Sequence, residues 1–476
     1  MPARASSGRV STTACNPMSA DRNETDSGHG FGWLLSKIAP IQPHETRAVS
    51  LAFGLFFCVF GGYAAVRPVR ETIATGLGKD RVADLFLVTW IASLAIIPIY
   101  GYFVGKFKRS VFLPWLYGII AAALAVVGLV LKADEKNVLS GEFFYVFISV
   151  LNLFVISVFW SFLLELFSKE QSRRLFGIIA AGGTAGAFLG PFYTDFFVTK
   201  IGIAGVLFSG AVMFGLTIFF QRALLGIWKT DSTATAASSG AAAGGSSVRG
   251  DRPIGGNPFA GFMKVLSSPY LLAIALFVVF ISTVNTFLYF EQLRMAGEAF
   301  ASTGDRARFF ARLDWIVQGL TIICQVVLTG RIAAKLGLTT LLIIVPIFMI
   351  GGFITLAATG TLTVLVVVFV ARRVGEYAFV RPAREMLFSR LDNETKYKAK
   401  NVIDVPVYRG ADALSAQVNT ALQGAGSSPA AIAYIGAGVA LAWLVNGWFL
   451  GRKADADEAR HVAADAARAR AAAEGG

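Results

Sequence analysis

The hydrophobic residues of this chain gather in long runs of about twenty residues, which short polar stretches separate. A run of that length, wound as an α-helix, crosses the hydrocarbon core of a bilayer. The pattern therefore predicts an all-α membrane protein with twelve transmembrane helices. The expected spans lie near 47–66, 83–105, 111–131, 142–167, 176–198, 203–225, 269–290, 313–334, 338–358, 361–381, 400–422 and 429–450.

The polar intervals divide the chain into five parts. Residues 1–40 are small and polar without the apolar core of a signal peptide, so we expect a disordered tail and interfacial segment. Residues 41–228 and 258–452 are expected to form two six-helix bundles. Residues 229–257, rich in Ala, Gly, Ser and Thr, predict a flexible cytoplasmic linker. Residues 453–476 are expected to form a cytoplasmic C-terminal tail.

Composition and charge agree with a protein embedded in a lipid bilayer. The chain is 55% hydrophobic and 15% charged, whereas soluble domains carry about a quarter charged residues. Its net charge of +13 comes from 43 basic and 30 acidic residues. The basic residues gather in loops on one membrane face, which predicts cytoplasmic termini and explains the charge without nucleic acid. We expect a multi-pass protein of a bacterial inner membrane, acting as a monomer.

Few residues of the kinds that form metal or catalytic sites are present. Three cysteines make no disulfide framework, and the three histidines lie outside the apolar runs. No glycine-rich loop ends in Lys-Ser or Lys-Thr, so no ATPase motor is predicted. We expect no metal, no cofactor and no enzymatic activity.

A charged string occurs twice in the chain. Tyr63–Glu71 and Tyr377–Glu385 lie 314 positions apart and share seven of nine residues. Charges near a bilayer are costly and usually functional, so the duplication indicates paired elements along a polar path. Because span one runs outward and span ten runs inward, we expect one copy at each mouth of that path, as a charged gate.

The residues of the first copy predict an anion site. Tyr63, Arg67, Arg70 and Glu71 would share one helical face. Pro68 removes a backbone donor and is expected to break the helix at Arg67. Guanidinium groups bind phosphate and carboxylate through two parallel hydrogen bonds. The alternative interpretation is that these arginines extend to lipid headgroups.

The second copy adds further candidates for substrate binding or gating. Glu376 is expected to pair with Arg373 or with Arg372. The same region contributes Tyr377, Arg381, Arg384, Glu385, Lys400, Asp404 and Arg409.

Several acidic residues leave their roles open at this stage. Asp404, Arg409 and Asp412 form either a self-neutralised cluster or a substrate site. Glu165 is a candidate for proton coupling, or a partner of Lys169 one helical turn away. The remaining candidates are charges of the outer loop or parts of an outer gate: Glu291, Arg294 and Asp314. The small-residue stretch 177–191 predicts close helix packing, with direct substrate contact as the alternative.

The layout and the motifs resemble known transporters. Six plus six spans around a cytoplasmic linker are typical of the major facilitator class. Residues 377–404 contain a tyrosine, a proline, an Arg-Glu-Met triplet, a Leu-Asp-x-Glu-x-Lys stretch and a lysine followed by Ile-Asp. This resembles the signature of the ATP:ADP translocases of intracellular bacteria and plastids. Tyr63–Glu71 is similar to that family's basic-acidic element after the first span.

The resemblance implies two bundles related by a pseudo-twofold axis, and antiport of an anionic, nucleotide-like substrate. By motif match it assigns binding or gating roles to Arg70, Arg384, Glu385, Lys400 and Asp404. The chain also departs from the pattern: Asp412 stands where the family tends to have a lysine, and Ala399 replaces a glycine. A smaller phosphorylated or other anion therefore remains open as the substrate.

Two other classes of function are compatible with the sequence. One is a proton-coupled facilitator of an unrelated small molecule, for which Glu165 and Glu376 are the candidate acids. The other is a membrane scaffold or enzyme, which the lack of clustered histidine, aspartate or serine in the apolar runs disfavours.

Overall fold

The computed structural model describes residues 41–42, 44–106, 109–239, 260–389, 391 and 393–474. Within these ranges seven helices are long and apolar enough to cross a membrane. The chain is a nearly all-helical, multi-pass membrane protein, whereas the count of twelve spans stays a prediction. The predicted tail at 1–40 and linker residues 240–257 lie outside the described residues.

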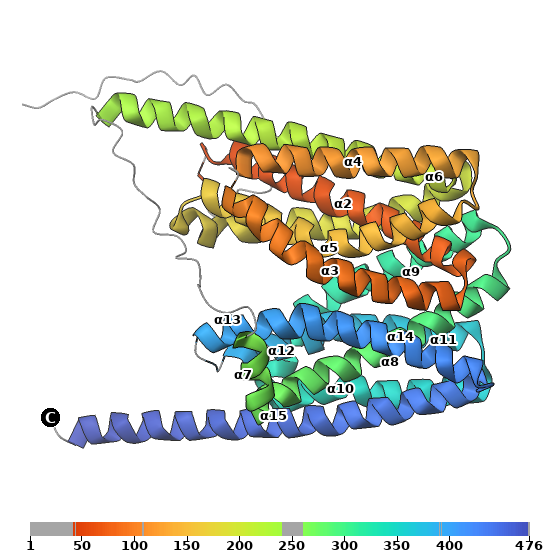
Figure 1. The fold of residues 1–476 in the computed structure, drawn as a ribbon. Helices are drawn as coiled ribbons and strands as arrows, with labels where there is room; N and C mark the ends of the chain where they lie inside the picture. Colours follow the sequence, from red (N-terminus) through yellow and green to blue (C-terminus); the bar gives the residue numbers. More distant parts are fainter. Residues whose placement is uncertain are drawn as a thin grey trace, which may run out of the picture.

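Among the residues that the structure describes, the first half contains five helical elements (Figure 1). The last of them has a glycine with φ of 71° at Gly202, a conformation that residues with a side chain rarely adopt. Helical torsions stop there, between the predicted spans 176–198 and 203–225. The elements are α2 (Thr46–Leu77), α3 (Lys79–Lys106), α4 (Arg109–Ala133), α5 (Val138–Leu166) and α6 (Lys169–Ser239).

The second half contains nine α-helices and three short π-helical segments among the described residues. Gly337, with φ of 76°, interrupts one helix as Gly202 does. The elements are α7 (Ala260–Ser267), α8 (Pro269–Ala299), α9 (Thr303–Cys324), η1 (Gln325–Thr329), α10 (Gly330–Thr359), α11 (Leu362–Gly375), η2 (Glu376–Val380), α12 (Arg381–Ser389), α13 (Asn393–Val402), η3 (Ile403–Val407), α14 (Tyr408–Gly424) and α15 (Pro429–Glu474).

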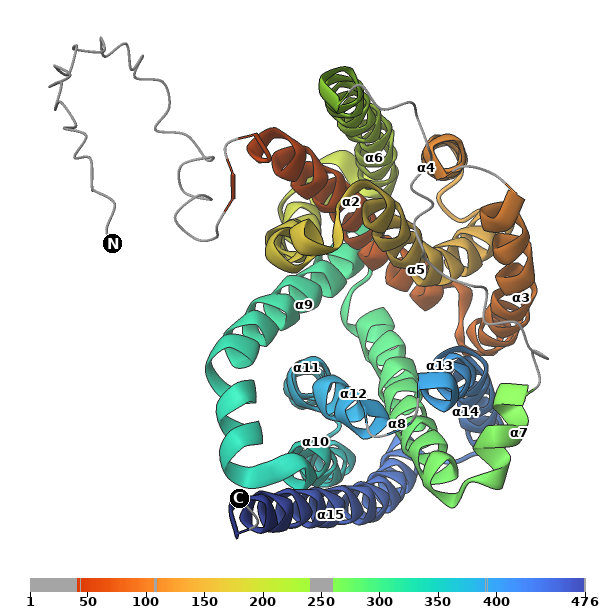
Figure 2. The same cartoon turned by 90° about the vertical axis from the view of Figure 1, so that its left-hand side faces the viewer.

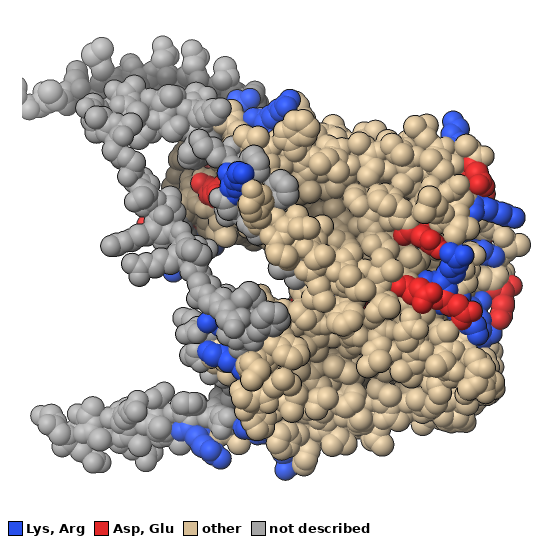
Figure 3. Space-filling model, viewed as in Figure 1, with Lys and Arg blue, Asp and Glu red and all other residues tan. Residues whose placement is uncertain are grey.

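Each half has its own hydrophobic core, and the two halves stand side by side (Figures 1 and 2). Phe159 and Phe214 are fully buried in the first core, and Phe277 and Trp443 in the second. In Figure 3 the halves separate at one end and meet at the other, with a broad uncharged belt between charged ends. The open end is the one where α2 begins and α15 ends (Figure 1).

Small residues let α2 and α6 pack closely, as the stretch 177–191 predicts. A Cβ atom built on Gly186 would lie 2.5 Å from the carbonyl oxygen of Phe57 and 2.7 Å from the backbone nitrogen of Gly61. Gly190, one turn further along α6, has backbone atoms of α2 equally near. The helix-packing interpretation of this stretch is therefore confirmed.

Two expectations about helix ends are corrected by the structure. The predicted break at Pro68 is wrong, because α2 continues through the proline to Leu77. Thr194 of α6 donates a hydrogen bond to the carbonyl oxygen of Ala65, 2.8 Å away, next to the Ala64 carbonyl that the proline leaves without its helical donor. A neighbouring helix therefore packs on α2 at the proline. At the other boundary, α6 extends through Ser239 into the expected linker.

Candidate functional site

A polar cavity of about 820 Å³ lies between the two halves and opens at their separated end (Figure 3). Residues of both halves line it, including both copies of the repeated string. Its lining holds seven arginines and six carboxylates, a difference of one positive charge. These residues are Arg67, Arg70, Arg372, Arg373, Arg381, Arg384, Arg409, Glu71, Asp314, Glu376, Glu385, Asp404 and Asp412.

The two copies of the string meet at mid-depth and extend in opposite directions along this one cavity. α2 runs from the open end to the closed end, and α11 to α12 runs the other way (Figure 1). Tyr63 and Tyr377 each lie near the middle of their helical run. Glu71 and Glu385 lie eight residues further on, about 12 Å along a helix at 1.5 Å per residue. The expected separation into two mouths therefore holds for the acidic ends of the strings and not for their tyrosines.

The first copy ties the two halves together at the closed end. Arg70 pairs with its neighbour Glu71, and its Nη1 donates to the Ser149 hydroxyl of α5 at 3.1 Å. Glu71 is 7% exposed and accepts a 2.6 Å hydrogen bond from the hydroxyl of Tyr289 on α8. Tyr145 lies beneath the Arg70 guanidinium, 5.4 Å from it, and contacts Tyr289 through the two hydroxyls.

Arg67 lies deeper in the cavity and also reaches the other half. Its guanidinium is 3.9 Å from Glu71 and 3.9 Å from Asp314 of α9. Asp314 pairs in turn with Arg373 of α11. One carboxylate of the second half therefore lies between an arginine of each half.

The second copy is linked by ion pairs within its own half. Glu376 accepts from Arg372 at 2.8 Å and is 3.4 Å from Arg381, so of the two pairings predicted for Glu376 the structure contains the one with Arg372. The Arg381 guanidinium lies 4.3 Å from the ring centre of Tyr377, and its side chain is 54% exposed. Among these arginines, Arg381 is therefore the one accessible from the open end of the cavity.

Two further ion pairs join α12 to the segment that follows it, at the open end. Arg384 is 3.1 Å from Asp404, and Lys400 is 2.5 Å from Glu385. All four residues carry roles implied by the family resemblance. The structure brings them together in sequence-distant pairs that helical spacing alone does not predict.

Arg409 and Asp412 form a mixed cluster on α14. Their side chains are 3.7 Å apart, and Asp412 accepts a 2.6 Å hydrogen bond from Ser282. Arg409 also donates to the backbone carbonyl of Ser149 in the other half, at 3.2 Å. The cluster is self-neutralised, yet it lines the cavity and bridges the halves.

Two further acidic residues lie in very different surroundings. Glu165 is exposed near the end of α5, and the described cavity lining does not include it. Asp314, expected as a charge of the outer loop or gate, lies eleven residues into α9 and is 6% exposed. The signal that the sequence offers for this placement is the apolar stretch that directly follows Asp314.

At the closed end a buried carboxylate joins the halves outside the cavity. Asp195 of α6 is 3% exposed and accepts hydrogen bonds from three side chains of α9. Arg308 lies at 3.3 Å, Arg312 at 3.2 Å through two nitrogens, and the Trp315 indole nitrogen at 2.9 Å. We call these four residues the outer latch. Figure 3 shows charged side chains gathered at this end, where the halves meet.

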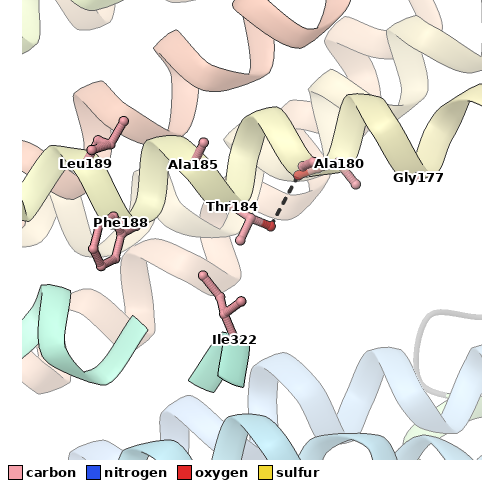
Figure 4. Close-up of a pocket in the computed structure, with 8 residues that line it drawn as sticks. Gly177, Ala180, Thr184, Ala185, Phe188, Leu189 and Ile322 are labelled. Carbon is pink, nitrogen blue, oxygen red and sulfur yellow. Dashed lines mark hydrogen bonds between the residues drawn. The ribbon is translucent and has the colours of Figure 1, made fainter. Parts of the chain in front are cut away.

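A second, shallow groove of about 550 Å³ borders the cavity between α6 and α9 (Figure 4). Small and apolar residues line it, and Ala180, Thr184 and Ile322 belong to the cavity lining as well. The Thr184 hydroxyl donates to the Ala180 carbonyl, as the dashed line shows. This groove therefore offers apolar surface and little polar chemistry.

Comparison with known proteins relates the chain to carriers. No protein-family model matches it. The ADP,ATP carrier protein 1 of Chlamydia muridarum is 21% identical over 80% of this chain and 82% of the carrier. The carrier of the same name from Chlamydia pneumoniae is 21% identical over 80% of this chain and 85% of its own length. The predicted resemblance to the ADP,ATP carriers is confirmed.

Solved structures of transporters share the fold of this chain. A bacterial homologue of the iron transporter ferroportin in an inward-facing state aligns with a TM-score of 0.60 at 14% identity, covering 86% of this chain and 98% of that one. The nucleoside transporter NupG aligns with a TM-score of 0.58 at 13% identity, covering 86% and 99%. The relatives are carriers and not enzymes, and the chain shares the fold of these transporters.

Proposed function

We propose that this protein is a secondary active transporter that exchanges an anionic, nucleotide-like substrate across a bacterial inner membrane by alternating access. The observation that carries the proposal is the arginine-lined cavity, open at one end, in a chain that resembles the ADP,ATP carriers along most of its length. Guanidinium forks match the geometry of phosphate oxygens, which favours a phosphorylated substrate over a neutral one.

The proposed orientation places both termini and the segment after α6 in the cytoplasm. The basic loops support this assignment. The cavity then opens inward, and the outer latch with the Glu71–Tyr289 bond closes its outer end. In the proposed topology twelve spans form two bundles related by a pseudo-twofold axis, and the cavity lies between them.

Charge balance in the cavity supports exchange. Every arginine of the repeated strings has a carboxylate partner, so the cavity without substrate is nearly neutral. A phosphate group that enters must compete with these carboxylates for guanidinium hydrogen bonds. Substrate binding and rearrangement of ion pairs are therefore one event, which links the movement of the halves to occupancy.

The test is uptake of labelled ATP by proteoliposomes that contain the purified protein and are preloaded with ADP. An Arg70→Ala/Arg384→Ala variant is compared with Arg452→Ala, which removes an exposed arginine stacked on Trp448. We expect uptake that requires internal ADP, is lost in the double variant and persists in the control. Folded protein that shows no uptake would refute the nucleotide proposal. Uptake that follows a proton gradient without internal ADP would favour the proton-coupled alternative.

A further inference from the structure

The second half carries two arginines that the first half lacks. The repeated strings are offset by 314 positions, and at that offset Arg372 and Arg373 correspond to Cys58 and Val59. Both arginines lie on α11, a few residues before Tyr377 of η2, and inside the predicted membrane region. An apolar pair in one half and a double cation in the other indicate that the duplication has been altered at this point.

These two arginines are buried and incompletely bonded. Arg372 is 4% exposed and Arg373 is 3% exposed, and both line the cavity. Each has one terminal nitrogen on a carboxylate, Glu376 or Asp314. In the part of the chain that the structure describes, Nε of Arg372 and Nη2 of Arg373 have no hydrogen-bond partner. Buried N–H groups without an acceptor are costly. These two nitrogens have almost no accessible surface, so an acceptor that enters the cavity would reach them when the two side chains turn toward it.

One further donor lies at the same place, and another lies two helical turns along the cavity. Arg67 of the first half lies 3.9 Å from Asp314, which Arg373 also binds. Thr321, seven residues after Asp314 on α9, is 5% exposed, lines the cavity and has a hydroxyl without a partner among the described residues. Residues seven apart share a helical face, so Thr321 and Asp314 point the same way, about 10 Å apart along the helix.

We propose that Arg372 and Arg373, together with Arg67, bind the phosphoryl group of the substrate, and that Asp314 binds these arginines while the cavity is empty. We call the three arginines the phosphoryl seat. The inference rests on the proposed transport function and adds the position of the anionic group. A phosphoryl group presents several acceptor oxygens, which suits donors that converge from α2 and α11. A single carboxylate such as Asp314 leaves part of those donors unbonded, as the structure shows.

The proposal gives Asp314 a definite mechanical role. Its interaction with Arg67 is an ion pair between the halves inside the cavity. A phosphoryl group that displaces Asp314 from Arg67 releases this tie, whereas an empty cavity retains it. Movement of the halves then needs an occupied seat, which is the condition for exchange rather than net leakage.

The experiment measures binding and transport separately on the full-length protein in detergent and in proteoliposomes. Binding is read as the rise in melting temperature with increasing inorganic pyrophosphate or ADP. The variants are Arg372→Lys and Arg373→Lys, which keep the charge and lose the planar fork, and Asp314→Asn. The control is Arg452→Lys, an exposed arginine stacked on Trp448 outside the described cavity lining.

We expect each seat lysine variant to weaken pyrophosphate and ADP binding at least tenfold, with the melting temperature of the ligand-free protein little changed. Asp314→Asn should bind pyrophosphate more tightly and should take up ATP without internal ADP. The control should match the unmodified protein in both assays.

The outcomes separate this inference from the proposed function. ADP-dependent uptake that is unaffected in both lysine variants would refute the seat and keep the exchanger. Pyrophosphate binding that the lysine variants weaken, in a protein that exchanges no nucleotide, would keep the seat and refute nucleotide exchange. Asp314→Asn that folds yet binds pyrophosphate more weakly would overturn the role of Asp314.

Discussion

The outer latch makes a quantitative prediction about which end of the transporter is open. Replacing Asp195 with Asn keeps the size of the side chain and removes the charge that holds Arg308, Arg312 and Trp315. Because the latch joins α6 of one half to α9 of the other, its loss should favour opening of the closed end. The cavity residues lie elsewhere, so binding chemistry is left intact.

The size of the effect follows from burial. Hydrogen bonds to charged groups contribute about 1.5–3 kcal/mol each when buried, and exposed ion pairs contribute about 0.2–1 kcal/mol. Asp195 is buried, but the side chains of Arg308 and Arg312 are 46% and 51% exposed, so the lower range applies to them. A total of about 2 kcal/mol is a shift of about 30-fold in the equilibrium between the two states.

The assay is the distance between spin labels on the two halves at the closed end, at positions Asp134 and Thr361, in a variant without native cysteines. Asp195→Asn should move a substantial fraction of the distance distribution to longer values. Glu298→Gln, which weakens an exposed pair within α8, should leave it unchanged. An unaltered distribution in Asp195→Asn would show that the latch does not set this equilibrium.

Two further predictions address stability. Gly186→Ala should lower the melting temperature, because its Cβ would lie 2.5–2.7 Å from backbone atoms of Phe57 and Gly61, and overpacking costs about 1–3 kcal/mol. The matched control is Gly177→Ala, whose Cβ would have nothing within 4 Å. Equal melting temperatures for the two variants would contradict the packing argument. Glu45, just before α2, is buried, which raises the pKa of its carboxyl, but hydrogen bonds from the Gln42 backbone, Gln171 and Arg174 outweigh burial and hold that pKa below its usual 4.5. The stability it contributes should be present above pH 4.5 and lost as the pH falls through the lowered pKa, so Glu45→Gln should flatten the acid limb of melting temperature against pH; an unchanged acid limb would show that Glu45 is not responsible.

The sequence predicted the elements of this fold better than their contacts. Apolar runs of membrane-spanning length identify helices directly, because each helix satisfies its own backbone hydrogen bonds in lipid. The repeated string likewise identified cavity residues, since its charges are rare in apolar surroundings. The small-residue stretch around Gly186 predicted close packing without naming α2 as the partner, because a helix face carries no information about its neighbour.

The parts of the site that sequence did not predict depend on tertiary contacts. Asp314 was placed at a loop because a charge ahead of an apolar run looks like a helix boundary, whereas α9 begins eleven residues earlier. The choice of Arg372 over Arg373 as the partner of Glu376 depends on Asp314, which is distant in sequence and engages Arg373. Pro68 was expected to end a helix because its backbone effect is local, while the contact of Thr194 with α2 beside the proline comes from α6.

The π-helical segment η2 has a consequence for how the two strings can be compared. The first string lies in regular α-helix, where Arg67 approaches Glu71 four residues on. The second passes through η2, whose wider turns bring residues five apart together, and there Arg381 approaches Glu376 five residues back. Equivalent residues of the two strings therefore lie on different helix faces and have different neighbours. A residue transferred from one string to the other would not acquire the contacts of the residue it replaces. The roles of the residues must therefore be assigned separately in each half, although the two strings share most of their sequence.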